Sequence, residues 1–215
     1  MNRKYFLTGF VVFTSTLLFA QPQVLSETSD GETVLNMLQE GGHVIYFRHA
    51  ERAQPSSVDS RLPEEFSSCL FPDVLLTEGG VESMRLLGQQ FNQLNIPVGE
   101  VVSSPACRCI ESAWFGFGKV VIDSSLDGVY DRDDAGDFII NETVTEEYAM
   151  NLRRALVTMP EEGSNTLLFA HSSNILALTG LELEQGEAAI FKPDGQGHFT
   201  YVSRLSLDEW ENLME

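Results

Sequence analysis

The chain has 215 residues, of which 43% are hydrophobic and 21% are charged, a composition that suits one globular domain with a hydrophobic core. Its formal net charge is −19 at pH 7, so most of its surface would repel a phosphate backbone, and a nucleic-acid partner is excluded. An anionic small ligand would need a locally basic pocket, and only 13 Lys and Arg residues can supply one.

The first 26 residues have the pattern of a signal peptide. Arg3 and Lys4 precede an uncharged, largely apolar run over residues 5–20, which matches the length of a signal core and is short for a membrane span. We predict cleavage after Ala20 or after Ser26, export to a periplasm, and no stable membrane insertion after cleavage. An uncleaved anchor is the alternative.

The rest of the chain, residues 27–215, is expected to form one domain, because it has no repeats, low-complexity tracts or obvious linkers. An apolar face with helical spacing predicts a helix after Thr77, and Gly41 and Gly42 end an earlier one. Predicted helices span residues 30–40, 77–94, 105–114, 143–157 and the stretch after 170 as far as 178.

Short runs rich in β-branched and aromatic residues predict the strands. These strands span residues 43–47, 100–103, 119–122, 167–170, 187–192 and 199–205, and the last two are expected to pair antiparallel. The segment from residue 52 to 76 has three prolines and little periodicity, so it is expected to be a long loop. Alternation of strands and helices predicts a three-layer α/β/α sandwich with a mainly parallel central sheet.

The sequence contains three cysteines, Cys69, Cys107 and Cys109. In an exported protein they indicate one disulfide and one spare thiol. Cys107 and Cys109 are too close in sequence to pair comfortably, so Cys69 is expected to pair with one of them. Three buried free thiols are the alternative. A zinc site is not expected, because a C-x-C pair without nearby histidines does not form a tetrahedral site.

Two histidines follow buried strands. His49 comes after the strand at 43–47, and His171 comes directly after the strand at 167–170. Ligands in open α/β sheets bind beyond the carboxyl ends of the strands, so the two histidines are expected to face each other across a crevice.

Two arginines make this crevice suitable for an anion. Arg48 precedes His49, and Arg108 lies in the helix that follows Ser103-Ser104-Pro105. A guanidinium group can bind two phosphate oxygens, and a helix N-terminus adds N–H groups and a favourable dipole. Phosphate fits this set of groups, although sulfate or carboxylate would also bind.

Three motifs in order along the chain resemble those of the histidine phosphatase superfamily. They are RHAE at 48–51, S-S-P-x-x-R-x-x-E-S-A at 103–113 and LLFAHSSN at 167–174. The resemblance is to the first, phosphoglycerate mutase-like branch, and LTEGG at 76–80 and the tail GEAAIFKPDGQGHF are similar to its small exported members. A second branch, with RHGxRxP and HD motifs, is the weaker match.

The resemblance implies a metal-independent phosphatase, with no cofactor, that acts on a small phosphorylated substrate. His49 would be the nucleophile and form a phosphohistidine. Arg48, Arg108 and His171 would hold the phosphoryl oxygens, together with the backbone at Ser172. No C-x5-R, G-x-S-x-G, Walker or H-E-x-x-H motif supports a different chemistry.

The general acid is where the sequence departs from the family. Asp127 is the nearest candidate, but its spacing differs, and it and the aspartates that follow it (Asp131, Asp133 and Asp134) could instead form a solvated acidic loop. Glu51 and Arg52 are candidates for a supporting role around the site. The alternative function is a non-catalytic envelope protein that binds a phosphoryl ligand in the same pocket.

Overall fold

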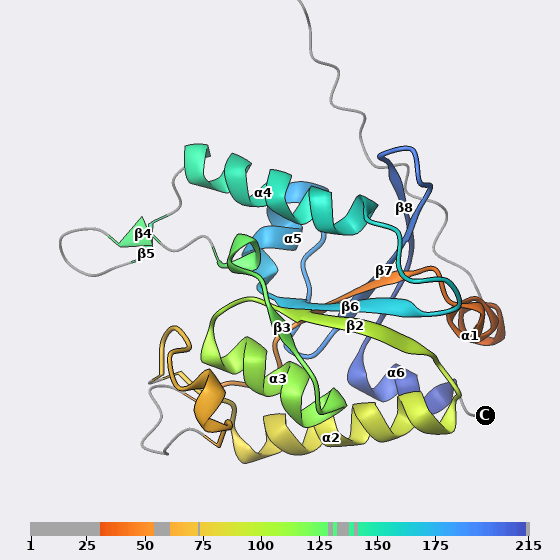
Figure 1. Cartoon of the computed structure of the whole chain (residues 1–215), viewed down its shortest axis with the longest axis horizontal. Helices are drawn as coiled ribbons and strands as arrows, with labels where there is room; N and C mark the ends of the chain where they lie inside the picture. Colours follow the sequence, from red (N-terminus) through yellow and green to blue (C-terminus); the bar gives the residue numbers. More distant parts are fainter. Residues whose placement is uncertain are drawn as a thin grey trace, which may run out of the picture.

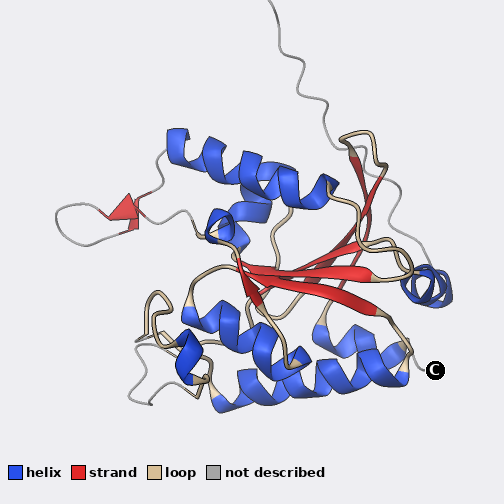
Figure 2. Cartoon of the chain, in the orientation of Figure 1, coloured by secondary structure: helices blue, strands red, loops and turns tan. Residues whose placement is uncertain are grey.

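A computed structural model describes residues 31–53, 61–72, 74–128, 131–132, 138–139 and 142–213. A central sheet lies between two layers of helices (Figures 1 and 2). On one side are α2 (Glu78–Gln93), α3 (Cys107–Phe117) and α6 (Leu207–Asn212), and on the other are α4 (Glu142–Val157) and α5 (Ser172–Thr179). The predicted three-layer α/β/α fold is confirmed.

The central sheet has the order β3-β2-β6-β1-β7-β8. Its strands are β1 (Val44–Arg48), β2 (Val98–Ser103), β3 (Val121–Ile122), β6 (Asn165–Ala170), β7 (Ala188–Pro193) and β8 (Phe199–Leu205). The first four strands of this order pair in parallel, and β7 and β8 add an antiparallel edge, as the sequence predicts. The carboxyl ends of β1, β2 and β6 therefore lie at one edge.

The central strand β1 is buried on both faces of the sheet. On β1, Ile45 and Phe47 belong to the core cluster under α2, α3 and α6, whereas Val44 and Tyr46 belong to the cluster under α4 and α5. Val34 and Leu38 of α1 (Gly31–Glu40) join the first cluster. Successive side chains of a strand point to opposite faces, so this uninterrupted apolar run is what a doubly covered strand requires.

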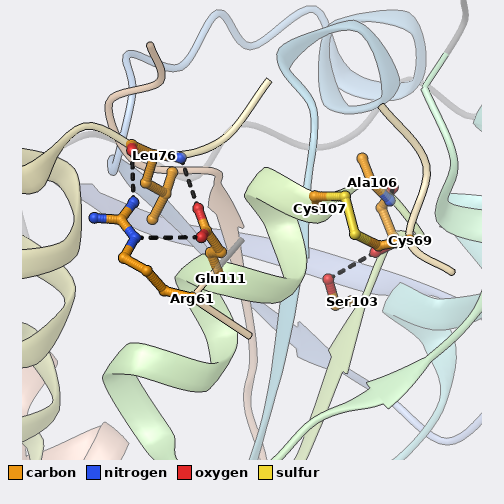
Figure 3. The surroundings of a disulfide bond; sticks show 8 residues. Arg61, Cys69, Leu76, Ser103, Ala106, Cys107 and Glu111 are labelled. Carbon is orange, nitrogen blue, oxygen red and sulfur yellow. Dashed lines mark hydrogen bonds and ion pairs between the residues drawn. A yellow bond between two sulfur atoms is a disulfide. The ribbon is translucent and has the colours of Figure 1, made fainter. Parts of the chain in front are cut away.

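The loop predicted between residues 52 and 76 is anchored where it is described. It contains a short 3-10 helix, η1 (Glu64–Phe66), and isolated bridges pair Arg52 with Leu76 and Leu70 with Ala106. A disulfide joins Cys69 to Cys107, the first residue of α3 (Figure 3). This resolves the open pairing, and Cys109 is the free, buried thiol. Two residues along a helix correspond to about 200° of rotation, so the two cysteines of α3 face different ways.

Two elements differ from the sequence prediction. Helix α3 begins at Cys107 rather than at Pro105, because Pro105 and Cys107 both form backbone hydrogen bonds with Leu70 of the loop. The terminal helix α6 was not predicted, yet Ser206 and Glu209 form a capping box at its start.

Further short elements were also not predicted: the 3-10 helix η2 (Ser124–Leu126) and the two-stranded pair β4 (Asp131–Arg132) and β5 (Phe138–Ile139). The predicted signal peptide lies outside the described residues. Among the helices that the structure describes, none is long and apolar enough to cross a membrane.

Candidate active site

The two predicted histidines lie side by side at the carboxyl edge of the sheet. Strands β1 and β6 are parallel neighbours in which Arg48 pairs with Ala170, so the residues that follow, His49 and His171, leave the sheet together. Their ring centroids are 5.8 Å apart, and their exposed fractions are only 4% and 1%. Parallel register therefore brings the two side chains together.

His49 has one defined tautomer. Its Nδ1 lies 2.8 Å from the carbonyl oxygen of Ala50. A carbonyl oxygen can only accept, so Nδ1 carries the proton and Nε2 has a free lone pair. Burial lowers the pKa of His49 from 6.5 to about 3, and the charges of Arg108, Arg48 and Arg52 act in the same direction. The imidazole is therefore neutral at physiological pH and has an unprotonated nitrogen available as a nucleophile.

His171 is held in the opposite tautomer. The Arg108 guanidinium, which has no acceptor, donates from Nη2 to Nδ1 of His171 at 3.2 Å. Nε2 therefore carries the proton and donates to Oγ of Ser104 at 2.9 Å. Burial, followed by the charge of Arg108, lowers the pKa of His171 well below its usual value. The carbonyl of His171 accepts a hydrogen bond of 2.6 Å from the hydroxyl of Tyr46.

Arg108 is buried, with an exposed fraction of 5%, on the first turn of α3. A fully buried serine on the same helix connects it to the chain beside His49. The N–H of Ala50 donates to Oγ of Ser112 at 3.0 Å, and that hydroxyl donates to the carbonyl of Arg108 at 2.7 Å. Ser112 therefore links the backbone of Arg108 to Ala50, whose carbonyl also sets the tautomer of His49.

The other predicted cations lie around the same centre. Arg48 is half-buried, and its Nη1 donates to the carbonyl of Leu183 at 2.7 Å, which directs the side chain toward the segment before β7. Arg48 and Arg52 both contribute to the lowered pKa values of His49 and His171. Three arginine charges thus act on two neutral imidazoles, an arrangement suited to an anionic ligand.

The predicted N–H cradle at the start of α3 is partly occupied by the protein itself. The N–H of Cys107 donates to the carbonyl of Leu70 at 2.9 Å, and the N–H of Ala106 donates to Oγ of Ser104 at 3.3 Å. Helix α5 begins directly after His171, its N-cap residue, so Ser172 lies at the helix N-terminus as predicted.

Asp127 follows η2 and lies near the cluster. Burial raises the pKa of its carboxyl, and the charge of Arg108 opposes that shift. Its carbonyl accepts a hydrogen bond of 2.8 Å from Nδ2 of Asn174 on α5, which ties this segment to the helix that begins at His171. Asp133 and Asp134 lie outside the described residues, as does the side chain of Asp131.

The structure gives specific contacts for Glu51 and Cys109. Oε2 of Glu51 accepts a hydrogen bond of 2.7 Å from the hydroxyl of Thr77, the N-cap residue of α2. Sγ of Cys109 lies 3.7 and 3.8 Å from the ring nitrogens of His171. Burial raises the pKa of this thiol to about 12, so it stays protonated.

A second cluster lies beside the disulfide, where Arg61 bridges the loop and α3 (Figure 3). Its Nε lies 3.6 Å from Oε1 of the fully buried Glu111, whose Oε2 accepts from the N–H of Leu76 at 2.7 Å. Burial raises the pKa of Glu111, while the Leu76 N–H and Arg61 oppose this shift. Among the described residues, no group of three His, Cys, Asp or Glu side chains could hold a metal ion.

A stretch of 99 residues is 33% identical to the lipopolysaccharide core heptose(II)-phosphate phosphatase of Escherichia coli. It covers 45% of this chain and 44% of that relative, so the match spans less than half the length of the curated protein. No protein-family model matches the chain.

Solved structures of phosphatases share the fold over most of its length. The protein histidine phosphatase SixA bound to tungstate has a TM-score of 0.53 at 18% identity, over 78% of this chain and 98% of that one. The ecdysone phosphate phosphatase of Bombix mori has a TM-score of 0.53 at 14% identity, over 75% and 92% of the two chains. The alpha-ribazole phosphatase of Shigella flexneri has 0.52 at 13%, over 77% and 96%. The fold that the resemblance implies is therefore confirmed.

Proposed function

We propose that this chain is a phosphatase that hydrolyses a phosphomonoester, or a phosphohistidine, through a phosphohistidine intermediate on His49. The observation that carries the proposal is the state of His49. Its Nδ1 is committed to the Ala50 carbonyl, and its pKa is lowered to about 3, so Nε2 is unprotonated beside a buried arginine. A neutral, oriented imidazole next to cations is what attack on a phosphoryl group requires.

The reaction would proceed in two displacements. Nε2 of His49 attacks phosphorus, the bond from phosphorus to the leaving oxygen breaks, and Asp127 gives its proton to that oxygen. Water then attacks the phosphohistidine, the bond from phosphorus to nitrogen breaks, and the Asp127 carboxylate takes a proton from the water. The raised pKa of Asp127 suits this exchange of roles, because it stays protonated to a higher pH than an ordinary aspartate.

The remaining polar groups would hold the phosphoryl oxygens. Arg48 and Arg108 supply guanidinium donors, and Ser172 supplies the backbone N–H of a helix start. His171 would supply its Nε2–H by exchanging its contact with Oγ of Ser104 for a phosphoryl oxygen. Arg52 adds charge without a direct role in bond breaking. These donors would offset the negative charge that develops on the equatorial oxygens in the transition state.

The compartment and substrate class are also proposals. The basic start and apolar run of residues 3–20 favour export to a periplasm, and the Cys69–Cys107 disulfide is typical of an oxidising compartment. Because the curated relative is named for a heptose phosphate, a phosphorylated sugar of the envelope is the first substrate class to test.

The test is hydrolysis of an aryl phosphate by the purified chain in the presence of a chelator. We expect turnover that His49→Ala lowers on the order of 10³-fold or more. His198→Ala is the matched control, because His198 is 66% exposed and pairs only with Asp194 among the described residues. Binding of phosphate without any turnover would favour a non-catalytic binding protein. Turnover that survives His49→Ala would overturn the mechanism.

A further inference from the structure

The loop before α2 is attached to α3 at two points one helical turn apart. The disulfide joins Cys69 to Cys107, and Arg61 and Leu76 both contact Glu111. Residues 107 and 111 are four apart in the helix and therefore lie on the same face. The loop is thus fixed against the face of α3 on which these two residues lie, and Arg108 is next to the first attachment point.

Backbone pairing strengthens the attachment at the disulfide. The N–H of Leu70 donates to the carbonyl of Pro105 at 2.8 Å, and the N–H of Cys107 donates to the carbonyl of Leu70 at 2.9 Å. The three residues Cys69, Leu70 and Phe71 therefore follow the start of α3 closely, held by a covalent bond and two hydrogen bonds.

Phe71 directs its ring onto Arg108. The Cζ atom of Arg108 lies 5.6 Å from the centre of the Phe71 ring, within the range of a cation–π contact. Phe71 has a φ of 59°, in the left-handed region that an aromatic residue seldom adopts. This backbone conformation, together with the packing of the partly buried ring against the core, places the side chain beside the guanidinium.

A hydrogen bond and a ring contact act on Arg108 in different ways. Nη2 donates to His171 at 3.2 Å, which directs one of the guanidinium nitrogens. An aromatic face packed against the group constrains the plane of the guanidinium fork, because the flat guanidinium has an attractive contact with the ring. Two phosphate oxygens can be bound together only when the fork is correctly oriented.

We propose that Phe71 is a positioning residue for Arg108, and that the Cys69–Cys107 disulfide holds Phe71 in place. The proposal rests on the proposed function in one respect, namely that Arg108 binds the phosphoryl group. It assigns the loop a role in phosphate affinity, in addition to any contact with the rest of a substrate.

Affinity for inorganic phosphate, measured by calorimetric titration of the full chain, tests this role without requiring turnover. We expect Phe71→Leu to weaken phosphate binding roughly 3- to 30-fold, and Phe71→Tyr, which keeps the aromatic face, to bind as the wild type does. Phe199→Leu is the matched control, because Phe199 is also a partly buried aromatic beside an arginine, with Arg153 at 5.8 Å. It should bind phosphate normally.

A double-mutant cycle tests the part played by the disulfide. Cys69→Ala with Cys107→Ala should weaken phosphate binding by a similar factor, and Phe71→Leu in that background should add little, because the ring is no longer held. A folded double variant with wild-type affinity, or full additivity, would overturn the role of the disulfide. If Phe71→Leu does not fold, Phe71→Met keeps the apolar volume without the aromatic face and replaces it.

The outcomes separate this inference from the proposed function. A folded Phe71→Leu protein that binds phosphate as tightly as the wild type overturns the inference alone. Wild-type protein that binds phosphate but never hydrolyses an ester, with binding still weakened by Phe71→Leu, overturns the phosphatase and supports the inference. Wild-type protein that hydrolyses an ester but does not bind phosphate overturns the inference and leaves the phosphatase.

Discussion

At the scale of single residues, the site contains two neutral imidazoles in opposite tautomers. His49 is held by a backbone carbonyl and leaves Nε2 free, whereas His171 accepts from Arg108 and carries its proton on Nε2. One ring can therefore donate an electron pair to phosphorus, while both nitrogens of the other contact Arg108 and Ser104. That division suits a nucleophile beside a second imidazole that orients the arginine.

The role of Asp127 can be tested through the leaving group. An alkyl alcohol needs a proton as it departs, whereas nitrophenolate does not, so Asp127→Asn should lower kcat/KM for an alkyl phosphate by about 10²- to 10⁴-fold. The same substitution should cost less than about tenfold for p-nitrophenyl phosphate, since that leaving group needs little protonation. Measurement of kcat/KM on both substrates is sufficient. An equal loss on the two would mean that Asp127 is not the acid.

The residues that could be predicted were those with a motif. His49, Arg108 and His171 lie at strand ends or at a helix start, and the structure brings them together. Ser104, Ser112 and Asn174 were not singled out, although each lies within a quoted motif. Their roles depend on side-chain hydrogen bonds between elements distant in sequence, such as Ser112 to Ala50, which no local pattern encodes.

At the scale of elements, α2 and α3 pack in close contact. The two helices run side by side below the sheet in Figure 1. At Gly88, in the middle of α2, an added Cβ would lie only 1.8 Å from the carbonyl oxygen of Gly116 in α3. The sequence shows Gly88 only as a weak point in a helix, whereas in the structure it allows the two backbones to meet.

Gly88→Ala is therefore expected to destabilise the protein, by about 1–3 kcal/mol or more, because a backbone atom must move to admit the methyl group. The matched control is Gly79→Ala in the first turn of the same helix, where the nearest atoms are the side-chain ends of Glu51 at 3.3 Å and Thr77 at 3.7 Å. That change should be neutral or stabilising by up to about 1 kcal/mol. Urea unfolding of both variants measures the difference, and equal stabilities would contradict the close contact.

The elements predicted best were those with strong periodicity. The apolar strands β1 and β6 and the helix α2 lie close to their predicted positions, within a few residues. The start of α3 was misplaced by two residues because a distant loop, through Leu70, competes for its first hydrogen bonds. Helix α6 was missed although Ser206 and Glu209 have the spacing of a capping box, since a six-residue helix has little periodicity to detect.

At the scale of the whole molecule, charge is distributed unevenly. The chain has 32 acidic residues against 13 basic ones, and three of the basic residues, Arg48, Arg52 and Arg108, act on the two site histidines. Composition predicted that an anion would need a local basic pocket. The sequence could not show that burial would keep both histidines neutral, because burial depends on how the layers close over the carboxyl edge.

This burial gives the whole protein a defined response to acid. The pKa of His49 is lowered from 6.5 to about 3, so between these values the unfolded chain binds a proton at this site that the folded protein does not. The free energy of unfolding must therefore fall as the pH falls through this window, by up to roughly 1.4 kcal/mol per pH unit from His49. His171 acts in the same direction, whereas the raised pKa values of Glu111 and Asp127 act in the opposite one.

Comparison of variants isolates the contribution of His49. Glutamine does not titrate, so the free energy of unfolding of His49→Gln should fall less than that of the wild type as the pH falls from about 6 to about 4. The difference between the two proteins should change by roughly 1.4 kcal/mol per pH unit, as measured by urea unfolding. Parallel curves for His49→Gln and wild type would mean that His49 is protonated in the folded protein near pH 4. Its Nε2 would then not be the free nucleophile at that pH, and the fold would not supply the neutral imidazole on which the proposed chemistry depends.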